Sequence, residues 1–202
     1  MIALVDYGAG NLRSVFKALE SIGGDVKIVD TAEEIAAADA VILPGVGNFG
    51  DGMNKIRERK LEQPILDAIA SGKPFLGICL GMQLLLEESE EAPGVKGLGV
   101  FKGKVVHFPA GIEKVPHMGW NDITIKSQHP CFEGIKDEDY FYFVHSYYAA
   151  PENPDVTLAT CDYIHQFTAV IGKDNIFATQ YHPEKSQDKG LQILKNFVKL
   201  VG

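Results

Sequence analysis

A cysteine stands between two glycines in the segment Gly77-Ile-Cys-Leu-Gly81. The segment follows an apolar run and precedes a pattern of helical spacing, so it has the form of a strand–turn–helix elbow that presents a nucleophile. The glycines allow a sharp turn, and the helix N-terminus beyond it favours the thiolate, which is the reactive form. We therefore predict that Cys79 is a nucleophile and that the backbone N–H of Leu80 is free to bind an oxyanion. A buried, inert cysteine in a tight turn is the alternative.

A thiol nucleophile needs a base, and His182 is the strongest candidate among six histidines. It lies in Tyr181-His-Pro-Glu184, directly after an apolar run, in a turn that Pro183 stiffens. Side chains two apart in extended chain face the same side, which places Glu184 to orient the imidazole. The residue types predict a Cys–His–Glu triad. For His-x-Glu taken alone, a loop histidine beside a surface glutamate is the alternative.

A third segment rich in glycine, Pro44-Gly-Val-Gly-Asn-Phe49, follows the apolar run 40–43. Its glycines leave backbone N–H groups uncovered at the carboxyl edge of the predicted sheet, where α/β proteins bind ligands. Val46 or Gly47 is therefore predicted to supply a second oxyanion donor. A phosphate-binding loop is not indicated, because no Lys-Ser/Thr pair follows.

The first half of the chain alternates apolar runs with helical patterns. The apolar runs predict strands at residues 2–5, 26–29, 40–43 and 75–78. Helices are predicted at residues 12–22, after the Thr31/Glu34 capping box, over 50–71 with an interruption near Pro64, and from 80 to about 89. Such alternation builds a parallel sheet covered by helices on both faces.

The second half is rich in β-forming residues and closes with a helical pattern from Leu191 to Val201. Strands are predicted at residues 99–108, 123–125, 140–148, 156–160, 167–171 and 176–181. Few helices separate these runs, so we expect antiparallel strands that extend the sheet. The predicted fold class is α/β, an open mixed sheet flanked by helices and parallel in its first half. No linker or repeat divides the chain, and we expect residues 1–202 to form a single domain.

Composition excludes several kinds of partner. A net charge of −8 argues against nucleic acid or an anionic membrane. No leader peptide or membrane-spanning apolar run is evident, and three widely spaced cysteines make a poor disulfide framework. We therefore expect a reduced, cytoplasmic protein. Spacings that hold zinc are absent, so neither a metal nor a cofactor is expected.

The three segments together resemble the signatures of the class I (triad) glutamine amidotransferases over essentially the whole chain. The matching residues are Pro44-Gly-Val-Gly47, Gly77-Ile-Cys-Leu-Gly-Met-Gln83 and His182-Pro-Glu184. Within that family, three more segments resemble the glutaminase subunits of imidazole glycerol phosphate synthases: Tyr7-Gly-Ala-Gly-Asn-Leu-Arg-Ser14, His117-Met-Gly-Trp-Asn121 and His145-Ser-Tyr147. Asn48 is a mild departure, because the family pattern has alanine there.

The resemblance implies roles for individual residues. Cys79 would attack the side-chain amide of glutamine, His182 would transfer protons, and Glu184 would hold His182. Lys185 would lie at the interface with a partner. The glutamine-binding positions would be Gly47, Gln83, Ser146 and Tyr147.

The resemblance also implies an activity and a partner. Glutamine would be hydrolysed to glutamate and ammonia through a thioester, without a cofactor. The ammonia would pass to a (β/α)₈-barrel cyclase in a heterodimer that makes imidazole glycerol phosphate for histidine biosynthesis. A synthase domain does not fit into 202 residues, so we expect the acceptor to be another chain. Two alternatives stay open: a glutaminase subunit of another synthase, such as pyridoxal phosphate synthase, or a stand-alone cysteine hydrolase or peptidase.

Overall fold

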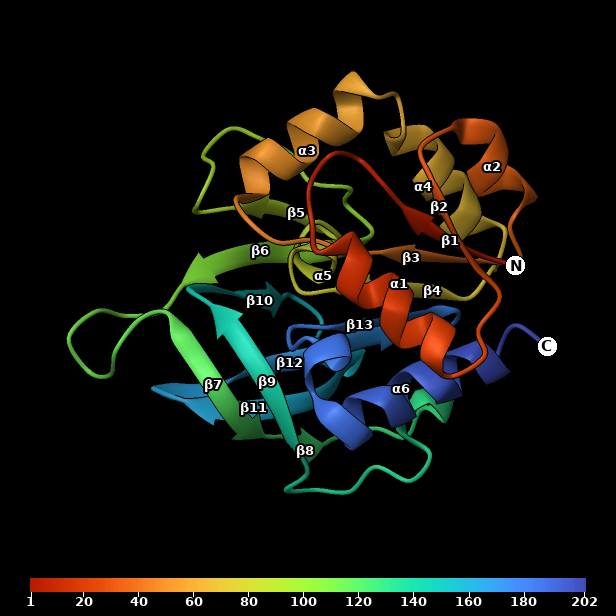
Figure 1. The fold of residues 1–202 in the computed structure, drawn as a ribbon. Helices are drawn as coiled ribbons and strands as arrows, with labels where there is room; N and C mark the ends of the chain where they lie inside the picture. The colour runs from red at the N-terminus through yellow and green to blue at the C-terminus, as the bar shows by residue number, and fades with distance from the viewer.

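Parallel strands from the amino-terminal half form one side of an 11-stranded main sheet (Figure 1). The computed structural model describes all residues, 1–202. In spatial order, the strands of this side are β2 (Val26–Val29), β1 (Ile2–Val5), β3 (Ala40–Leu43) and β4 (Phe75–Ile78), at the predicted positions. All but the edge strand β2 are buried along their whole length, which explains why they appear in the sequence as continuous apolar runs.

The other side of the main sheet is mostly antiparallel and begins at β13 (Ile176–Thr179), which is parallel to β4. The sheet continues through β12 (His165–Lys173), β10 (Tyr147–Pro151), β6 (Phe101–His107) and β5 (Leu86–Ser89), while β11 (Thr157–Tyr163) and β8 (Thr124–Ile125) extend it from β12. A separate two-stranded sheet pairs β7 (His117–Asp122) with β9 (Tyr140–His145). This open mixed sheet confirms the predicted fold class.

Helices cover both faces of the main sheet and create two apolar cores (Figure 1). One face carries α1 (Leu12–Ser21) and α6 (Gln187–Lys199), and the other carries α2 (Ala32–Ala37), α3 (Phe49–Glu58) and α4 (Glu62–Ala70). Side chains of β1 alternate between the cores: Ile2 and Leu4 belong to the first, and Ala3 and Val5 to the second. Short 3₁₀ helices are η1 (Pro130–Phe132), η2 (Pro154–Val156) and η3 (Pro183–Lys185). None of the helices is long and apolar enough to cross a lipid bilayer.

The helix predicted from residue 80 to about 89 is wrong beyond its first turn. Only α5 (Leu80–Gln83) is helical, and the chain then extends into β5. The leucines at positions 84–86 are fully buried, and the carbonyl groups of Leu84 and Leu86 accept hydrogen bonds from Leu98 and Gly99. A short continuous apolar run does not distinguish a helix from a buried strand by its periodicity. Here, hydrogen bonds with a later segment of the chain decide that residues 86–89 form a strand.

Other boundaries also differ from the prediction, and the strand β7 was not predicted at all. The helical region 50–71 breaks at residues 59–61, where Lys60 has a φ of +58°, and not at Pro64. Pro64 lies in the first turn of α4, where a missing N–H is tolerated. The run 140–148 is two strands, because Ser146 separates β9 in the small sheet from β10 in the main sheet.

Close packing at the end of β4 requires small residues on either side of Cys79. A Cβ on Gly81 would lie 1.9 Å from the carbonyl oxygen of Leu43 at the end of β3. A Cβ on Gly77 would lie 2.9 Å from the Cβ of Ala178 on β13. The pattern Gly-x-Cys-x-Gly therefore reflects the close packing of β4 against β13 and of α5 against β3.

Replacing Gly81 with alanine is expected to destabilise the protein by about 1–3 kcal/mol, because the added methyl group has to displace the backbone of β3. Equilibrium urea unfolding measures the loss. Gly24→Ala is the matched control, since a Cβ there would lie 3.1 Å from the carbonyl oxygen of Leu19 and the residue does not have a positive φ. Equal losses in the two variants would contradict the packing argument.

Candidate active site

Cys79 lies in a strained turn between β4 and α5. Its φ of +53° and ψ of −106° fall in a region that residues other than glycine rarely occupy. Its N–H donates a hydrogen bond to the carbonyl oxygen of Thr179 at the end of β13, at 2.7 Å. Backbone strain of this kind costs about 1–3 kcal/mol and persists where the surrounding structure enforces it. The turn directs the cysteine side chain into a cavity.

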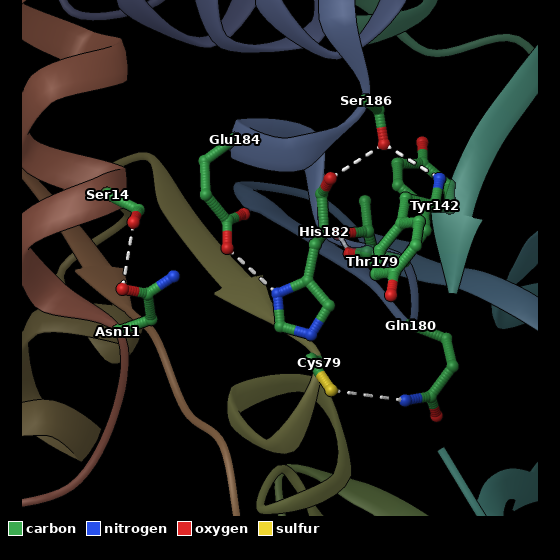
Figure 2. Close-up of polar contacts among 10 residues, drawn as sticks. Asn11, Ser14, Cys79, Tyr142, Thr179, Gln180, His182, Glu184 and Ser186 are labelled. Carbon is green, nitrogen blue, oxygen red and sulfur yellow. Dashed lines mark hydrogen bonds and ion pairs between the residues drawn. The ribbon is translucent and has the colours of Figure 1, made fainter. Parts of the chain in front are cut away.

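His182 and Glu184 form a buried hydrogen-bonded pair beside Cys79 (Figure 2). His182 Nδ1 lies 2.8 Å from Glu184 Oε1, and each side chain is 1% exposed. Because Nδ1–H donates to the carboxylate, Nε2 is the atom left to exchange a proton. Nε2 has no hydrogen-bond partner within the chain, and the ring faces the Cys79 sulfur. The arrangement is that of a nucleophile, a base and an orienting acid.

The backbone of His182 is fixed by strand β9. The N–H of His182 donates to the carbonyl oxygen of Tyr142 at 2.9 Å. Ser186 Oγ donates to the carbonyl oxygen of His182 at 2.6 Å and accepts from the N–H of Tyr142 at 2.9 Å (Figure 2). The imidazole is therefore held by a neighbouring strand as well as by its own turn.

The pKa of His182 is raised to about 10 although the ring is buried. Burial lowers the pKa, because a buried imidazolium is poorly solvated. The negative charge of the Cys79 sulfur, followed by the Glu184 carboxylate, raises the pKa and outweighs burial. A protonated imidazole beside the sulfur provides the kind of environment in which a cysteine acts as a nucleophile.

One cavity of about 610 Å³ brings the predicted site residues together. All of them line it except Glu184, which lies behind His182. Three further lining residues were not singled out in the sequence: Glu91, Pro116 and Val144. Glu91 Oε2 accepts a hydrogen bond from the N–H of Phe49 at 2.7 Å, a contact between segments far apart in the chain that no local pattern reveals. Asn11 and His145, which belong to motifs of the family resemblance, also line the cavity.

The N–H of Leu80 is not free in this structure, contrary to the expectation from the sequence. It donates a hydrogen bond to the carbonyl oxygen of Gly45 at 3.3 Å. The C=O and N–H of one trans peptide point in opposite directions, so the N–H of Val46 points away from Leu80. The N–H groups of Leu80 and Val46, two of the proposed oxyanion donors, are therefore not directed at a common point. Glycine at 45 and at 47, the latter with a φ of +105°, makes this loop unusually free to change conformation.

Gln83 is buried and its amide nitrogen is already engaged. Nε2 donates to the carbonyl oxygen of Tyr147 at 2.9 Å and to Gln180 Oε1 at 3.0 Å. Gln83 thus connects α5 to β10 and to the segment that follows β13. Gln180 was not predicted as a site residue, and its only sequence signal is its position two residues before His182.

Lys185 is exposed and lies at the edge of the triad. Its Nζ lies 5.8 Å from the centre of the Tyr142 ring, within the range of a cation–π contact. Ser146 and Tyr147 line the same cavity at the junction of β9 and β10. No group of three or more His, Cys, Asp or Glu side chains is arranged to hold a metal ion.

Comparison with known proteins identifies the class of protein to which the chain belongs. The family model for glutamine amidotransferase class-I matches residues 3–201, and the chain belongs to this family. Solved structures share the fold at low sequence identity. A glutamine amidotransferase crystal structure has a TM-score of 0.78 at 22% identity, covering 100% of both chains. The structure of PurLQS from Thermotoga maritima has a TM-score of 0.80 at 20% identity, covering 100% of this chain and 98% of that one.

Within this family, the chain groups with the HisH subunits of imidazole glycerol phosphate synthase. The subunit from Methanothermobacter thermautotrophicus is 53% identical over 201 residues, covering 100% of this chain and 99% of the relative. The subunit from Methanocaldococcus jannaschii is 52% identical over 201 residues, covering 100% of both. The resemblance inferred from the motifs is confirmed.

Removing the Cys79 sulfur is expected to lower the pKa of His182 by at least about one unit. In Cys79→Ala the charge that raises the pKa most is absent, while burial and Glu184 remain. NMR titration of the imidazoles measures the shift. His129, whose ring stacks on Phe177 away from the triad, is the internal control and should titrate as in the wild type. An unchanged pKa of His182 would rule out this effect of the sulfur.

Proposed function

We propose that this chain hydrolyses glutamine to glutamate and ammonia at Cys79, His182 and Glu184, and supplies the ammonia for imidazole glycerol phosphate synthesis in histidine biosynthesis. The observation that carries the proposal is the meeting of the three side chains in one cavity, with the Nδ1 of His182 bonded to the carboxylate at 2.8 Å. The similarity to HisH subunits supports this pathway over pyridoxal phosphate synthesis. We further propose that residues 1–202 act as one glutaminase domain.

In the proposed reaction the Cys79 thiolate attacks the side-chain amide carbon of glutamine, and a C–S bond forms as the carbonyl oxygen becomes an oxyanion. The His182 imidazolium gives its Nε2 proton to the leaving nitrogen, the C–N bond breaks, and ammonia departs from the thioester. His182, now neutral, takes a proton from water, which attacks the thioester and releases glutamate. The Cys79 thiolate and the imidazolium are thereby restored.

The oxyanion requires hydrogen-bond donors. In the present conformation of the loop at Gly45–Gly47, the N–H groups of Leu80 and Val46 are not directed at it. We propose that rotation of the Gly45–Val46 peptide releases the N–H of Leu80 and turns the N–H of Val46 toward the cavity. The hydrogen bond from Leu80 to Gly45, at 3.3 Å, supports this requirement. Glutamine would then be held by the backbone at Gly47, by Gln83 and by Ser146 and Tyr147.

The acceptor of ammonia is proposed to be a separate (β/α)₈-barrel cyclase in a heterodimer. Exposed apolar side chains near the cavity support a docking face there. Val46 lines the cavity and is 38% exposed. On β7, Met118 and Trp120 are 62% and 46% exposed, and Met118 pairs with the cavity-lining Val144. We propose a cytoplasmic location, which the three free cysteines support.

Replacing Cys79 with alanine is expected to abolish glutamine hydrolysis, because no other thiol lines the cavity. Synthesis by the complex from free ammonia should persist, since that step does not need the thiol. Assays of the complex with glutamine and with ammonium salt measure both. Cys131→Ala and Cys161→Ala are controls expected to retain the activity, as both thiols are buried and burial raises their pKa, that of Cys131 to about 12. Substantial glutaminase activity in Cys79→Ala would overturn the proposal.

The isolated chain is expected to hydrolyse glutamine slowly and to be activated by its partner, with a coupling of up to about 150-fold. Lys185 directly follows the triad, so Lys185→Ala should weaken complex formation or activation and leave the slow basal rate nearly unchanged. Glutaminase rates with and without saturating cyclase, for wild type and Lys185→Ala, test this. A lone subunit as fast as the complex would favour the stand-alone hydrolase instead.

A further inference from the structure

The side chain of Gln180 contacts the sulfur of Cys79. Its Nε2 lies 3.7 Å from Cys79 Sγ, within the range of an N–H···S hydrogen bond, and the residue is 0% exposed. Its Oε1 accepts a hydrogen bond from Gln83 Nε2 at 3.0 Å. In Figure 2 the sulfur faces the His182 ring on one side and the Gln180 amide on another. The proposed triad chemistry makes no use of this amide.

The backbone carbonyl group of Tyr147 determines, through Gln83, which way the Gln180 amide is oriented. The carbonyl oxygen of Tyr147 can only accept, so Gln83 presents its NH₂ group to it at 2.9 Å. The same NH₂ group faces Gln180, which must therefore offer its oxygen there. The NH₂ group of Gln180 is then left to face Cys79.

A second donor holds the carbonyl oxygen of Tyr147, from which the hydrogen bonds through Gln83 and Gln180 begin. His145 Nδ1 lies 2.9 Å from the carbonyl oxygen of Tyr147. Burial lowers the pKa of His145 to about 3, so the ring is neutral and carries its proton on Nδ1. Its Nε2 accepts from His117 Nδ1 at 3.0 Å. The carbonyl that orients Gln83 is thus held by neutral donors from two directions.

The position of Gln180 in the chain explains why it reaches the sulfur. It lies directly after the end of β13 and two residues before His182, and both side chains face the Cys79 sulfur (Figure 2). The intervening Tyr181 points the other way and stacks on Phe141 at 4.1 Å between ring centres. A buried amide costs free energy unless it is hydrogen-bonded, and leucine would fill similar space without that requirement.

We propose that Gln180 is a further catalytic residue of the proposed glutaminase reaction, on which this inference rests: it donates a hydrogen bond to the Cys79 sulfur and stabilises the thiolate before attack. Gln180 contacts the sulfur on a different side from His182, and the imidazolium of His182 supplies the positive charge that compensates the thiolate. As the thioester forms, the sulfur loses its negative charge and this hydrogen bond weakens. When the thioester is hydrolysed, the bond is restored and favours thiolate as the leaving group.

Four other titratable groups belong to the site, and none of them is hydrogen-bonded to the Gln180 side chain. His182 faces the sulfur directly, with Glu184 behind the ring. The hydroxyl of Tyr7, whose pKa is raised by burial and by the Cys79 charge, donates to the carbonyl oxygen of Pro44. His145 lines the cavity in its neutral form.

The test measures thiolate formation at Cys79 without glutamine. The rate of iodoacetamide alkylation is followed across about pH 5 to 10 in the full chain, with mass spectrometry of the Cys79 peptide as the readout. In Gln180→Leu the midpoint pH of the curve is expected to rise by about one unit, since the hydrogen bond to a charged acceptor is lost. Gln180→Glu keeps an acceptor for Gln83 and places a carboxylate beside the sulfur, so its midpoint should rise further.

Two controls separate this role from a structural one. Gln166→Leu makes the same substitution at an exposed position of β12 and should leave the curve unchanged. The alkylation rate at the high-pH plateau, where the thiolate is fully formed, should stay within about 2-fold of wild type if the site is intact. Wild-type midpoints in both Gln180→Leu and Gln180→Glu would overturn the inference.

Glutamine hydrolysis in complex with the cyclase supplies an independent readout. In Gln180→Leu, kcat at neutral pH is expected to fall about 10-fold, with KM nearly unchanged, because the thiolate and not substrate binding is affected. A rise confined to KM would overturn the inference. If the wild-type complex fails to hydrolyse glutamine, the proposed function is wrong, while the alkylation curves still decide what Gln180 does to the sulfur.

Discussion

The parallel pairing of β4 with β13 is the interaction on which the site depends. The strands are in register so that Ile78 lies opposite Thr179, and both end at the same edge of the sheet. The hydrogen bond from the Cys79 N–H to the Thr179 carbonyl, at 2.7 Å, extends the ladder by one residue. The residue after β4 is therefore the cysteine, and the segment after β13 carries Gln180 and His182. A slip of one residue would turn these side chains away from each other.

Burial gives the site its electrostatic character. Charges in a poorly solvated cavity interact strongly, so each must be compensated by a partner. His182 lies between two sources of negative charge, the Cys79 sulfur and Glu184, and this raises its pKa against the effect of burial. The second carboxylate oxygen of Glu184 has no hydrogen-bond partner within the chain, so the stability of its charge depends on His182. The two side chains form one electrostatic unit.

The sequence predicted features that depend on local residue order, and missed those that depend on distant contacts. Continuous apolar runs located the buried parallel strands, and residue types at strand ends located Cys79, His182 and Glu184. The segment 84–89 pairs with residues 97–105, so its conformation is set by a later part of the chain. The contact of Gln180 with Cys79 joins residues 101 apart in the sequence. No local pattern predicts such contacts.

The structure separates the formation of the nucleophile from the stabilisation of charge on the substrate. Cys79, His182 and Glu184 are already assembled without a substrate, whereas the N–H of Leu80 is bound to the carbonyl oxygen of Gly45. Breaking one neutral hydrogen bond costs about 0.5–1.5 kcal/mol, far less than altering the sheet that holds the triad. A Cβ on Gly45 would lie 2.5 Å from the Tyr7 hydroxyl, so a side chain at this position does not fit. In the proposed reaction, a partner docked over Val46 can therefore control the rate through this peptide without moving the triad.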